Sequence, residues 1–211
     1  MIRSMSSWIH CITLLILLST SGSLWSQQLE DHTGYHDHSA HLKALSNTHF
    51  TVSDVSYVIP NKILLDESGK QIELKTLLNR GHPVALNFIF TTCTTICPVM
   101  TATFLQMRKV LGKAGANVLF VSISIDPEYD RPAVLKKYAT LFDVSEGWTF
   151  LTGEGNSINH VLRSFDVYAG SKMNHQPVYL FKKPDSPTWI RVDGLAGGKE
   201  LANLVMERLL N

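Results

Sequence analysis

Two cysteines, Cys93 and Cys97, follow an apolar run at residues 83–90 and precede a stretch with helical periodicity. A helix N-terminus carries partial positive charge and free N–H groups, which lower the pKa of a nearby thiol. Pro98 suits the first helical position, where its missing N–H costs no hydrogen bond. The Cys-x3-Cys spacing lets both sulfurs turn toward one metal ion and still permits a disulfide. The pattern therefore favours thiolate chemistry, with two inert buried cysteines as the alternative.

The chain has 211 residues and a formal net charge of +1, which fits one domain with appendages and gives no reason to expect nucleic acid as a partner. Residues 1–26 carry Arg3, a short apolar core and then small residues, a pattern typical of a secretory signal peptide. An uncleaved membrane anchor is the alternative, although the core is short for a full span. Either way we expect an exported domain, periplasmic or anchored facing the periplasm, where disulfides persist. Membrane contact is expected only through this segment, if it stays uncleaved.

Residues 27–51 lack sustained periodicity and predict an exposed tail before the folded domain, residues 52–211. Imidazoles at high density bind copper or zinc loosely. Four tail histidines lie close together in the sequence: His32, His36, His38 and His41. They are therefore possible accessory metal ligands, and a solvated tail without metal is an equal alternative.

Apolar runs predict strands covered on both faces, and apolar residues at helical spacing predict amphipathic helices. The predicted order is a hairpin at 63–74, a helical turn at 75–79, a strand at 83–89, a helix at 100–111, a strand at 118–125, a helix at 132–142, a strand remnant at 150–151, a helix at 157–165, a hairpin of strands at 178–181 and 189–192, and a helix at 199–210. This order predicts an α/β, thioredoxin-like fold, with a central mixed sheet flanked by helices and an N-terminal β-hairpin extension. The cysteines then fall at the carboxyl end of the first core strand, where open α/β sheets place their sites.

Three segments together resemble the signature segments of the Sco/SenC family: NFIFTTCTTICP at 87–98, VSISIDPEYDRP at 121–132 and NHQPVYLF at 174–181. The resemblance covers roughly residues 52–211. Members of this family are thioredoxin-like proteins that bind copper and help to assemble the CuA centre of respiratory oxidases. The resemblance implies that Cys93, Cys97 and His175 are copper ligands and that Asp126 is a characteristic residue.

The residue types are consistent with copper as the cargo. Soft thiolates select Cu(I), and imidazole suits both Cu(I) and Cu(II). A structural zinc site needs a fourth protein ligand, and none is obvious. His175 precedes a strand expected beside the cysteine strand, so its ring is expected to reach the cysteine turn.

Four neighbouring residues have expected supporting roles. Asp126 is expected to orient a ligand, and capping of the following turn is its alternative or additional role. Asp130 is expected to cap the next helix. Met100 and Met173 are expected to pack, although a thioether can bind Cu(I).

Two kinds of function remain open at the sequence level. The resemblance implies a copper metallochaperone, which exchanges copper with an oxidase subunit or another copper chaperone. The alternative is an enzyme, a thiol–disulfide oxidoreductase in which Cys93 attacks, Cys97 resolves and a thiol reductant resets the pair. A copper or redox sensor would use the same residues. His175 discriminates between the first two, because metal binding needs it and disulfide exchange does not.

Overall fold

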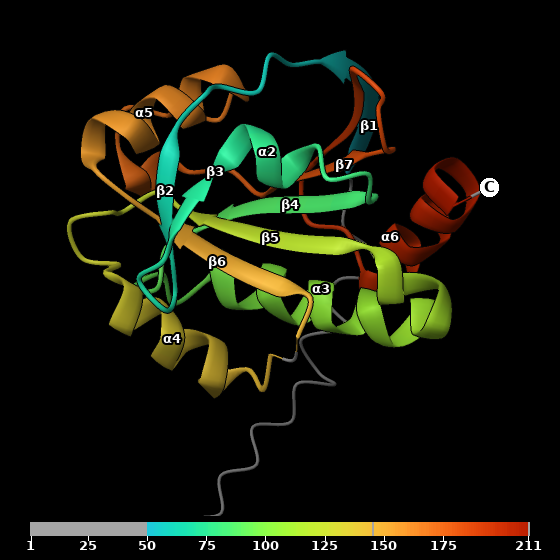
Figure 1. The fold of residues 1–211 in the computed structure, drawn as a ribbon. Coiled ribbons are helices and arrows are strands. Elements are labelled where there is room, and N and C mark those ends of the chain that lie inside the picture. Colours follow the sequence, from blue (N-terminus) through green and yellow to red (C-terminus); the bar gives the residue numbers. More distant parts are fainter. Residues whose placement is uncertain (1–49, 145, 211) are drawn as a thin grey trace, which may run out of the picture. The chain divides into compact units, whose positions relative to one another are not determined.

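Eight strands form a mixed sheet in the computed structural model, which describes residues 50–144 and 146–210 (Figure 1). The strands are β1 (Thr51–Ser56), β2 (Ile63–Asp66), β3 (Gln71–Glu73), β4 (Val84–Ile89), β5 (Leu119–Ser124), β6 (Trp148–Thr152), β7 (Val178–Lys182) and β8 (Thr188–Asp193). The helices are α2 (Leu74–Leu78), α3 (Ile96–Leu111), α4 (Pro132–Leu141), α5 (Gly155–Ser164) and α6 (Gly198–Val205), with 3-10 segments η2 (Gly112–Asn117) and η3 (Lys172–Asn174) and a π-helical end η4 (Met206–Leu210). The predicted signal segment at 1–26 and the four tail histidines lie outside the described residues.

The strands lie in the order β1-β8-β7-β4-β5-β6-β2-β3. β4, β5 and β6 are parallel neighbours. On the other side of β4, β7 runs antiparallel to β4, and β8 runs antiparallel to β7 and therefore in the same direction as β4. The predicted hairpin is formed by β2 and β3, and β2 joins the sheet through β6. The central strand β4 is therefore flanked by one parallel and one antiparallel partner.

Helices cover both faces of this sheet: α3, α4 and α6 pack on one face, and α2 and α5 on the other (Figure 1). All six residues of β4 are buried. Ala85 and Ile89 of β4 belong to the core on the α3 side, whereas Leu86 and Phe88 belong to the core on the α5 side. A strand covered on both faces takes apolar residues at nearly every position, which explains the apolar run. Asn87 is the polar exception in β4, and its side-chain oxygen accepts a hydrogen bond from the Ser122 hydroxyl. The predicted α/β arrangement of a mixed central sheet between helices is confirmed.

Two strands are more extensive than the sequence suggests. The predicted remnant at 150–151 is part of the five-residue strand β6, which lies between β5 and β2. β1 begins at Thr51, one residue before the predicted start of the folded domain, and pairs with β8 along its whole length. Most of its residues are exposed, so neither an apolar run nor a clean alternation marks it. Pairing with β8 makes this segment a strand.

The helix after the cysteine turn begins at Ile96 and not at residue 100. Pro98 is therefore the third helical residue and not the first. The first four N–H groups of a helix have no intrahelical acceptor, so proline costs no hydrogen bond at this position either. The earlier start places Cys97 within the first turn of α3.

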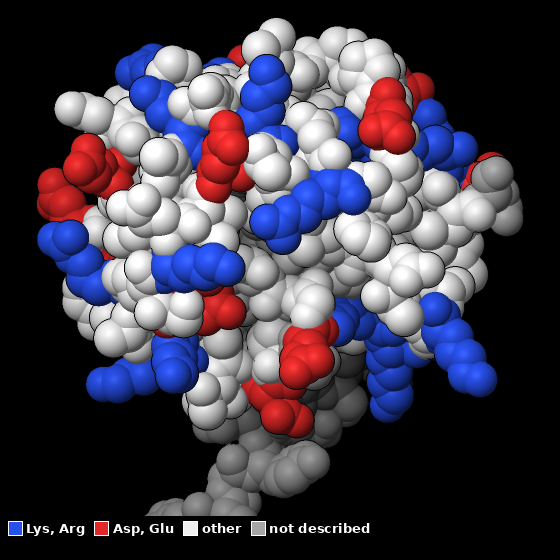
Figure 2. Space-filling model, viewed as in Figure 1, with Lys and Arg blue, Asp and Glu red and all other residues white. Residues whose placement is uncertain are grey.

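Basic and acidic side chains are interspersed on the face drawn in Figure 2, and neither sign forms an extended field there. Within the described part of the chain, none of the helices has both the length and the apolar character that crossing a membrane requires.

Phe104 of α3 lies in an aromatic cluster, and its replacement tests the core on the α3 side. Its ring centroid lies 5.3 Å from that of Phe120 and 5.6 Å from that of Trp148. We expect Phe104→Ala to lower the free energy of unfolding by about 3–5 kcal/mol, because it leaves a cavity among rings that cannot collapse fully. Val58→Ala at an 86% exposed position is the control, with an expected change below about 0.5 kcal/mol. Urea unfolding measures both, and similar changes in the two variants would contradict this account of the core.

Candidate metal centre

The turn between β4 and α3 brings the two cysteines together. Cys93 lies in the turn and is 9% exposed, whereas Cys97 is fully buried in the first turn of α3. Both are free thiols. The backbone N–H of Cys97 donates to the Cys93 sulfur at 3.5 Å, and the Thr95 hydroxyl lies 3.6 Å from the same sulfur. The helix N-terminus therefore points its N–H groups at Cys93 alone.

This arrangement makes the two thiols chemically different. Burial opposes ionisation of Cys93, but hydrogen bonds from the backbone N–H groups of Cys97 and Thr95 and from the Thr95 hydroxyl outweigh it and lower the Cys93 pKa. Burial raises the pKa of Cys97 far above that of an ordinary thiol, and the neighbouring charge of Cys93 adds to the effect. Cys93 is thus the more readily ionised thiol of the pair, and Cys97 keeps its proton to higher pH.

His175 lies directly after η3 and is buried, with 5% of its surface exposed. Its Nε2 lies 3.0 Å from the carbonyl oxygen of Phe88 in β4. Because a carbonyl oxygen only accepts, Nε2 carries the proton and Nδ1 keeps its lone pair. Burial lowers the pKa of His175, and the hydrogen bond to Phe88 offsets this only in part, so the ring is neutral near pH 7. A neutral imidazole whose second nitrogen donates to a carbonyl has the form of a metal-binding histidine.

Cys93 and His175 line one cleft of about 400 Å³. The cysteine turn, residues 92–96, and the segment at 172–177 both contribute to its walls. No group of three or more His, Cys, Asp or Glu side chains lies close enough together to hold a metal ion within residues 50–144 and 146–210. The structure thus pairs Cys93 with Cys97 and lines the same cleft with Cys93 and His175, but it does not gather all three into a closed ligand set.

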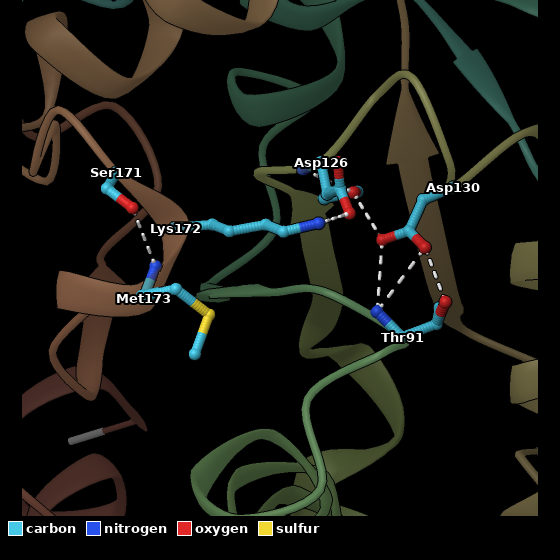
Figure 3. A network of polar contacts seen from close by, with 7 residues as sticks. Thr91, Asp126, Asp130, Ser171, Lys172 and Met173 are labelled. Carbon is cyan, nitrogen blue, oxygen red and sulfur yellow. Dashed lines mark hydrogen bonds and ion pairs between the residues drawn. The ribbon is translucent and has the colours of Figure 1, made fainter.

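Asp126 acts on the segment that carries His175. Its carboxylate pairs with the ammonium group of Lys172 in η3 (Figure 3). The Lys172 pKa is raised by this hydrogen bond. The same ammonium group lies 5.6 Å from the ring centroid of Phe90. Asp126 therefore attaches the His175 segment to the end of β5, and its carboxylate has no hydrogen bond to Cys93, Cys97 or His175.

Asp130 has a role that the sequence did not indicate. It does not cap α4, whose N-cap is Arg131 and has no side-chain hydrogen bond, so the predicted role is wrong. The Asp130 side chain is fully buried and accepts hydrogen bonds from the Thr91 N–H at 3.1 Å, from the Thr91 hydroxyl and from the Ser124 hydroxyl at 2.6 Å (Figure 3). This carboxylate joins the start of the cysteine turn to the end of β5. A buried carboxylate needs such donors, and only the packed structure shows which donors reach it.

The two methionines near the predicted ligands differ in their surroundings. Met100 is fully buried in α3, as expected. Met173 is 78% exposed and lines the cleft with Cys93 and His175, so the expectation that it packs is wrong. It lies in the middle of η3, a three-residue turn in which no residue is buried.

The fold and the site define a thioredoxin-like α/β protein with an asymmetric dithiol beside a neutral histidine. The SCO1/SenC family profile matches residues 59–191. The chain belongs to this family. A SCO1 protein homolog of Bacillus subtilis is 38% identical over 139 residues, which are 62% of this chain and 71% of that protein.

Solved structures agree with this assignment and confirm the predicted fold. BsSco, described as a member of the Sco family of cytochrome c oxidase assembly proteins with a disulfide switch, has a TM-score of 0.62 and 30% sequence identity, covering 74% of this chain and 95% of that one. The ScoI protein of Bradyrhizobium japonicum, solved with copper bound, has a TM-score of 0.56 and 25% identity, covering 70% of this chain and 96% of that one.

Replacement of Asp130 tests its role in holding the cysteine turn. We expect Asp130→Ala to lower the free energy of unfolding by about 3 kcal/mol, because it leaves the Thr91 N–H and the Ser124 hydroxyl buried without an acceptor. Glu128→Ala, at an exposed position of the same loop, is the control and is expected to have almost no effect. If urea unfolding finds the two variants equally stable, the Asp130 hydrogen bonds do not hold the turn.

The different pKa values of the two thiols predict different rates of alkylation. At about pH 8, near the ordinary thiol pKa, we expect iodoacetamide to modify Cys93 much faster than Cys97. As the pH is lowered, the alkylation rate of Cys93 should fall only when the pH drops below the lowered pKa of Cys93. Alkylation of Cys97 should stay slow until the pH is well above the ordinary pKa of a thiol. Mass spectrometry of the proteolytic peptide that carries the remaining thiol, Cys97 in Cys93→Ser and Cys93 in Cys97→Ser, measures each rate separately from that of Cys11. Equal rates in the two variants would show that the helix N-terminus does not distinguish the cysteines.

Proposed function

We propose that this chain is a copper metallochaperone, which holds copper with Cys93, Cys97 and His175 and passes it to a respiratory oxidase subunit with a CuA-type site. The observation that carries the proposal is a dithiol beside a neutral histidine that lines the same cleft. The copper-bound state of the Bradyrhizobium protein and the description of the Sco family as oxidase assembly proteins support it.

The ligand chemistry follows from the state of each group. Cys93 is the more readily ionised of the two cysteines and binds copper before Cys97 does, because its pKa is lowered. Cys97 keeps its proton until copper displaces it, since a metal-bound sulfur must be a thiolate. His175 binds through Nδ1, because Nε2 donates to Phe88 and keeps the ring oriented. Two soft sulfurs and one imidazole hold Cu(I) in a trigonal site and also suit Cu(II).

Copper release requires an accessible site. The three ligands do not form a closed set in this structure, so the cleft has to narrow around the metal when copper binds. The same cleft gives the ligands of a recipient protein a path to the metal. Transfer then proceeds by exchange, in which each bond to the recipient forms as one to Cys93, Cys97 or His175 breaks.

The site also supports a second function, thiol–disulfide exchange. The observation that favours it is the asymmetry of the cysteines, in which the more readily ionised thiol, Cys93, lines the cleft and the less acidic thiol, Cys97, is fully buried. The Cys93 thiolate attacks one sulfur of a partner's disulfide, and the other sulfur leaves as a thiolate. Cys97 then loses its proton and attacks Cys93, which releases the second partner thiol and leaves a Cys93–Cys97 disulfide. A thiol reductant must supply two electrons to restore the pair. Both functions can serve one recipient, because a dicysteine copper site accepts metal only when it is reduced.

These functions place the folded domain outside the cytoplasm. We propose that residues 1–26 direct export and that the domain acts in the periplasm, free or anchored by that segment. The histidines at 32, 36, 38 and 41 are proposed as accessory copper ligands that collect the metal.

Copper titration of the reduced chain tests the proposed ligand set. We expect one equivalent of tightly bound copper, with thiolate-to-Cu(II) charge-transfer absorption when Cu(II) is used. His175→Ala and the double variant Cys93→Ser/Cys97→Ser should lose the tight binding, because each removes at least one of the three ligands. His160→Ala is the matched control, since His160 is an exposed histidine of α5.

The tail histidines are tested separately by replacing all four with alanine in the full chain. Tight binding should persist, with loss only of weaker equivalents. The metallochaperone proposal is overturned if His175→Ala keeps the affinity of the wild-type chain, or if the tail variant binds no copper. Reduction of a partner's disulfide that survives His175→Ala would then favour the oxidoreductase.

A further inference from the structure

We propose that Met173 is a further copper-binding residue, whose thioether takes Cu(I) at the mouth of the cleft before the cysteines and His175 hold it. This inference rests on the copper-binding function proposed above. It adds an entry ligand, and with it a preference for Cu(I), to that site.

The surroundings of Met173 exclude a packing role. A methionine side chain is apolar, so burial in a hydrophobic core would be favourable. Met173 nevertheless is 78% exposed. It is not part of either hydrophobic core cluster. Its thioether is therefore accessible to a ligand in the cleft.

The turn that carries Met173 is held in place by its neighbours. The Met173 N–H donates to the Ser171 hydroxyl at 3.3 Å, and the His175 N–H donates to the Lys172 carbonyl at 3.2 Å. The Lys172 side chain extends to Asp126, while the Met173 side chain turns away from that ion pair (Figure 3). The thioether is thus displayed from a fixed backbone and does not contribute to the contacts that fix it.

The order of exposure defines a path into the site. Met173, Cys93 and His175 all line the cleft, whereas Cys97 does not. Exposure falls from 78% at Met173 to 9% at Cys93, 5% at His175 and 0% at Cys97. A copper ion that enters from solvent or from a donor therefore meets Met173 first and Cys97 last.

Thioether chemistry suits the first contact. A thioether is neutral at every pH and soft, so it binds Cu(I) in preference to Cu(II) or Zn²⁺. When it takes Cu(I) from a donor, one copper–donor bond breaks and one copper–sulfur bond forms, with no proton released and no electron transferred. Cys93 and His175 bind next, and Cys97 follows as its proton leaves to solvent. The thioether remains a weak additional ligand of the loaded site, and it does not take the metal away from the stronger thiolate ligands.

Met173→Leu in the full-length chain tests this role, since leucine keeps an apolar side chain of similar volume and lacks sulfur. We expect Cu(I) affinity, measured by competition with a chromophoric Cu(I) chelator, to fall about threefold to tenfold, because one weak soft ligand is lost. Uptake from that chelate should slow by a similar factor, while Cu(II) affinity stays unchanged. Met206→Leu is the matched control, because it removes a thioether from η4, which does not line the cleft.

Selenomethionine labelling gives a direct readout. X-ray absorption at the selenium edge of the Cu(I)-loaded protein should show a copper–selenium distance in the wild-type chain and in Met206→Leu, and none in Met173→Leu. Unchanged Cu(I) affinity and uptake in Met173→Leu, with no copper–selenium signal in the wild type, overturn the inference. The inference is also overturned if Met173→Leu slows copper transfer to a recipient but leaves Cu(I) affinity and uptake unchanged, because Met173 would then contact the recipient and not the metal.

The two proposals fail in distinguishable ways. If His175→Ala and the double cysteine variant lose copper while Met173→Leu behaves as wild type, the proposed ligand set of Cys93, Cys97 and His175 is supported and the proposed role of Met173 is wrong. If Met173→Leu alone weakens Cu(I) binding, Met173 is a ligand and the proposed Cys93, Cys97 and His175 set is wrong.

Discussion

The buried carboxylate of Asp130 is the constraint on which the site depends. A carboxylate without contact to water must be surrounded by donors, and its donors come from Thr91 and Ser124. Thr91 begins the turn that carries Cys93, and Ser124 ends β5. The position of the cysteine turn is therefore set by the need of the buried Asp130 carboxylate for hydrogen-bond donors at the carboxyl ends of the parallel strands β4 and β5. Apolar packing of β4 brings the chain to this point, but it does not determine how the turn continues.

Strand pairing brings the histidine to the cysteines. β7 runs antiparallel to β4, so the start of β7 lies beside the carboxyl end of β4. His175 shortly precedes β7 and reaches the carbonyl of Phe88 near the end of β4. The backbone of the cysteine strand thereby orients the imidazole and selects Nδ1 as the free nitrogen. The ion pair of Lys172 with Asp126 holds the same segment to the end of β5.

The site balances retention against release. Cys97 and His175 are buried, while Cys93 and the exposed Met173 line an open cleft, so the proposed ligand set has an enclosed part and an accessible part. A closed set of ligands would bind copper more tightly and release it to another protein more slowly. An open cleft with soft ligands of graded exposure suits a protein that passes copper on. The lowered pKa of Cys93 favours both copper binding and nucleophilic attack, so the two proposed functions draw on the same pair of cysteines.

The sequence by itself determined the strand and helix order, the thioredoxin-like sheet and the dithiol turn, because a buried strand requires continuous apolar residues and an amphipathic helix requires its own spacing. Through its resemblance to the Sco/SenC family, the sequence also identified Cys93, Cys97 and His175 as candidate copper ligands. Tertiary structure alone decided the hydrogen-bond partners of Asp130 and the exposure of Met173. Asp130 follows a strand and precedes a proline, a local pattern that fits a helix cap, but burial directed its carboxylate to Thr91 and Ser124. Met173 resembles any core methionine in sequence, and only the placement of η3 beside the cleft leaves its sulfur exposed. Local patterns specify which residues prefer burial, whereas hydrogen-bond partners and exposure depend on segments far apart in the chain.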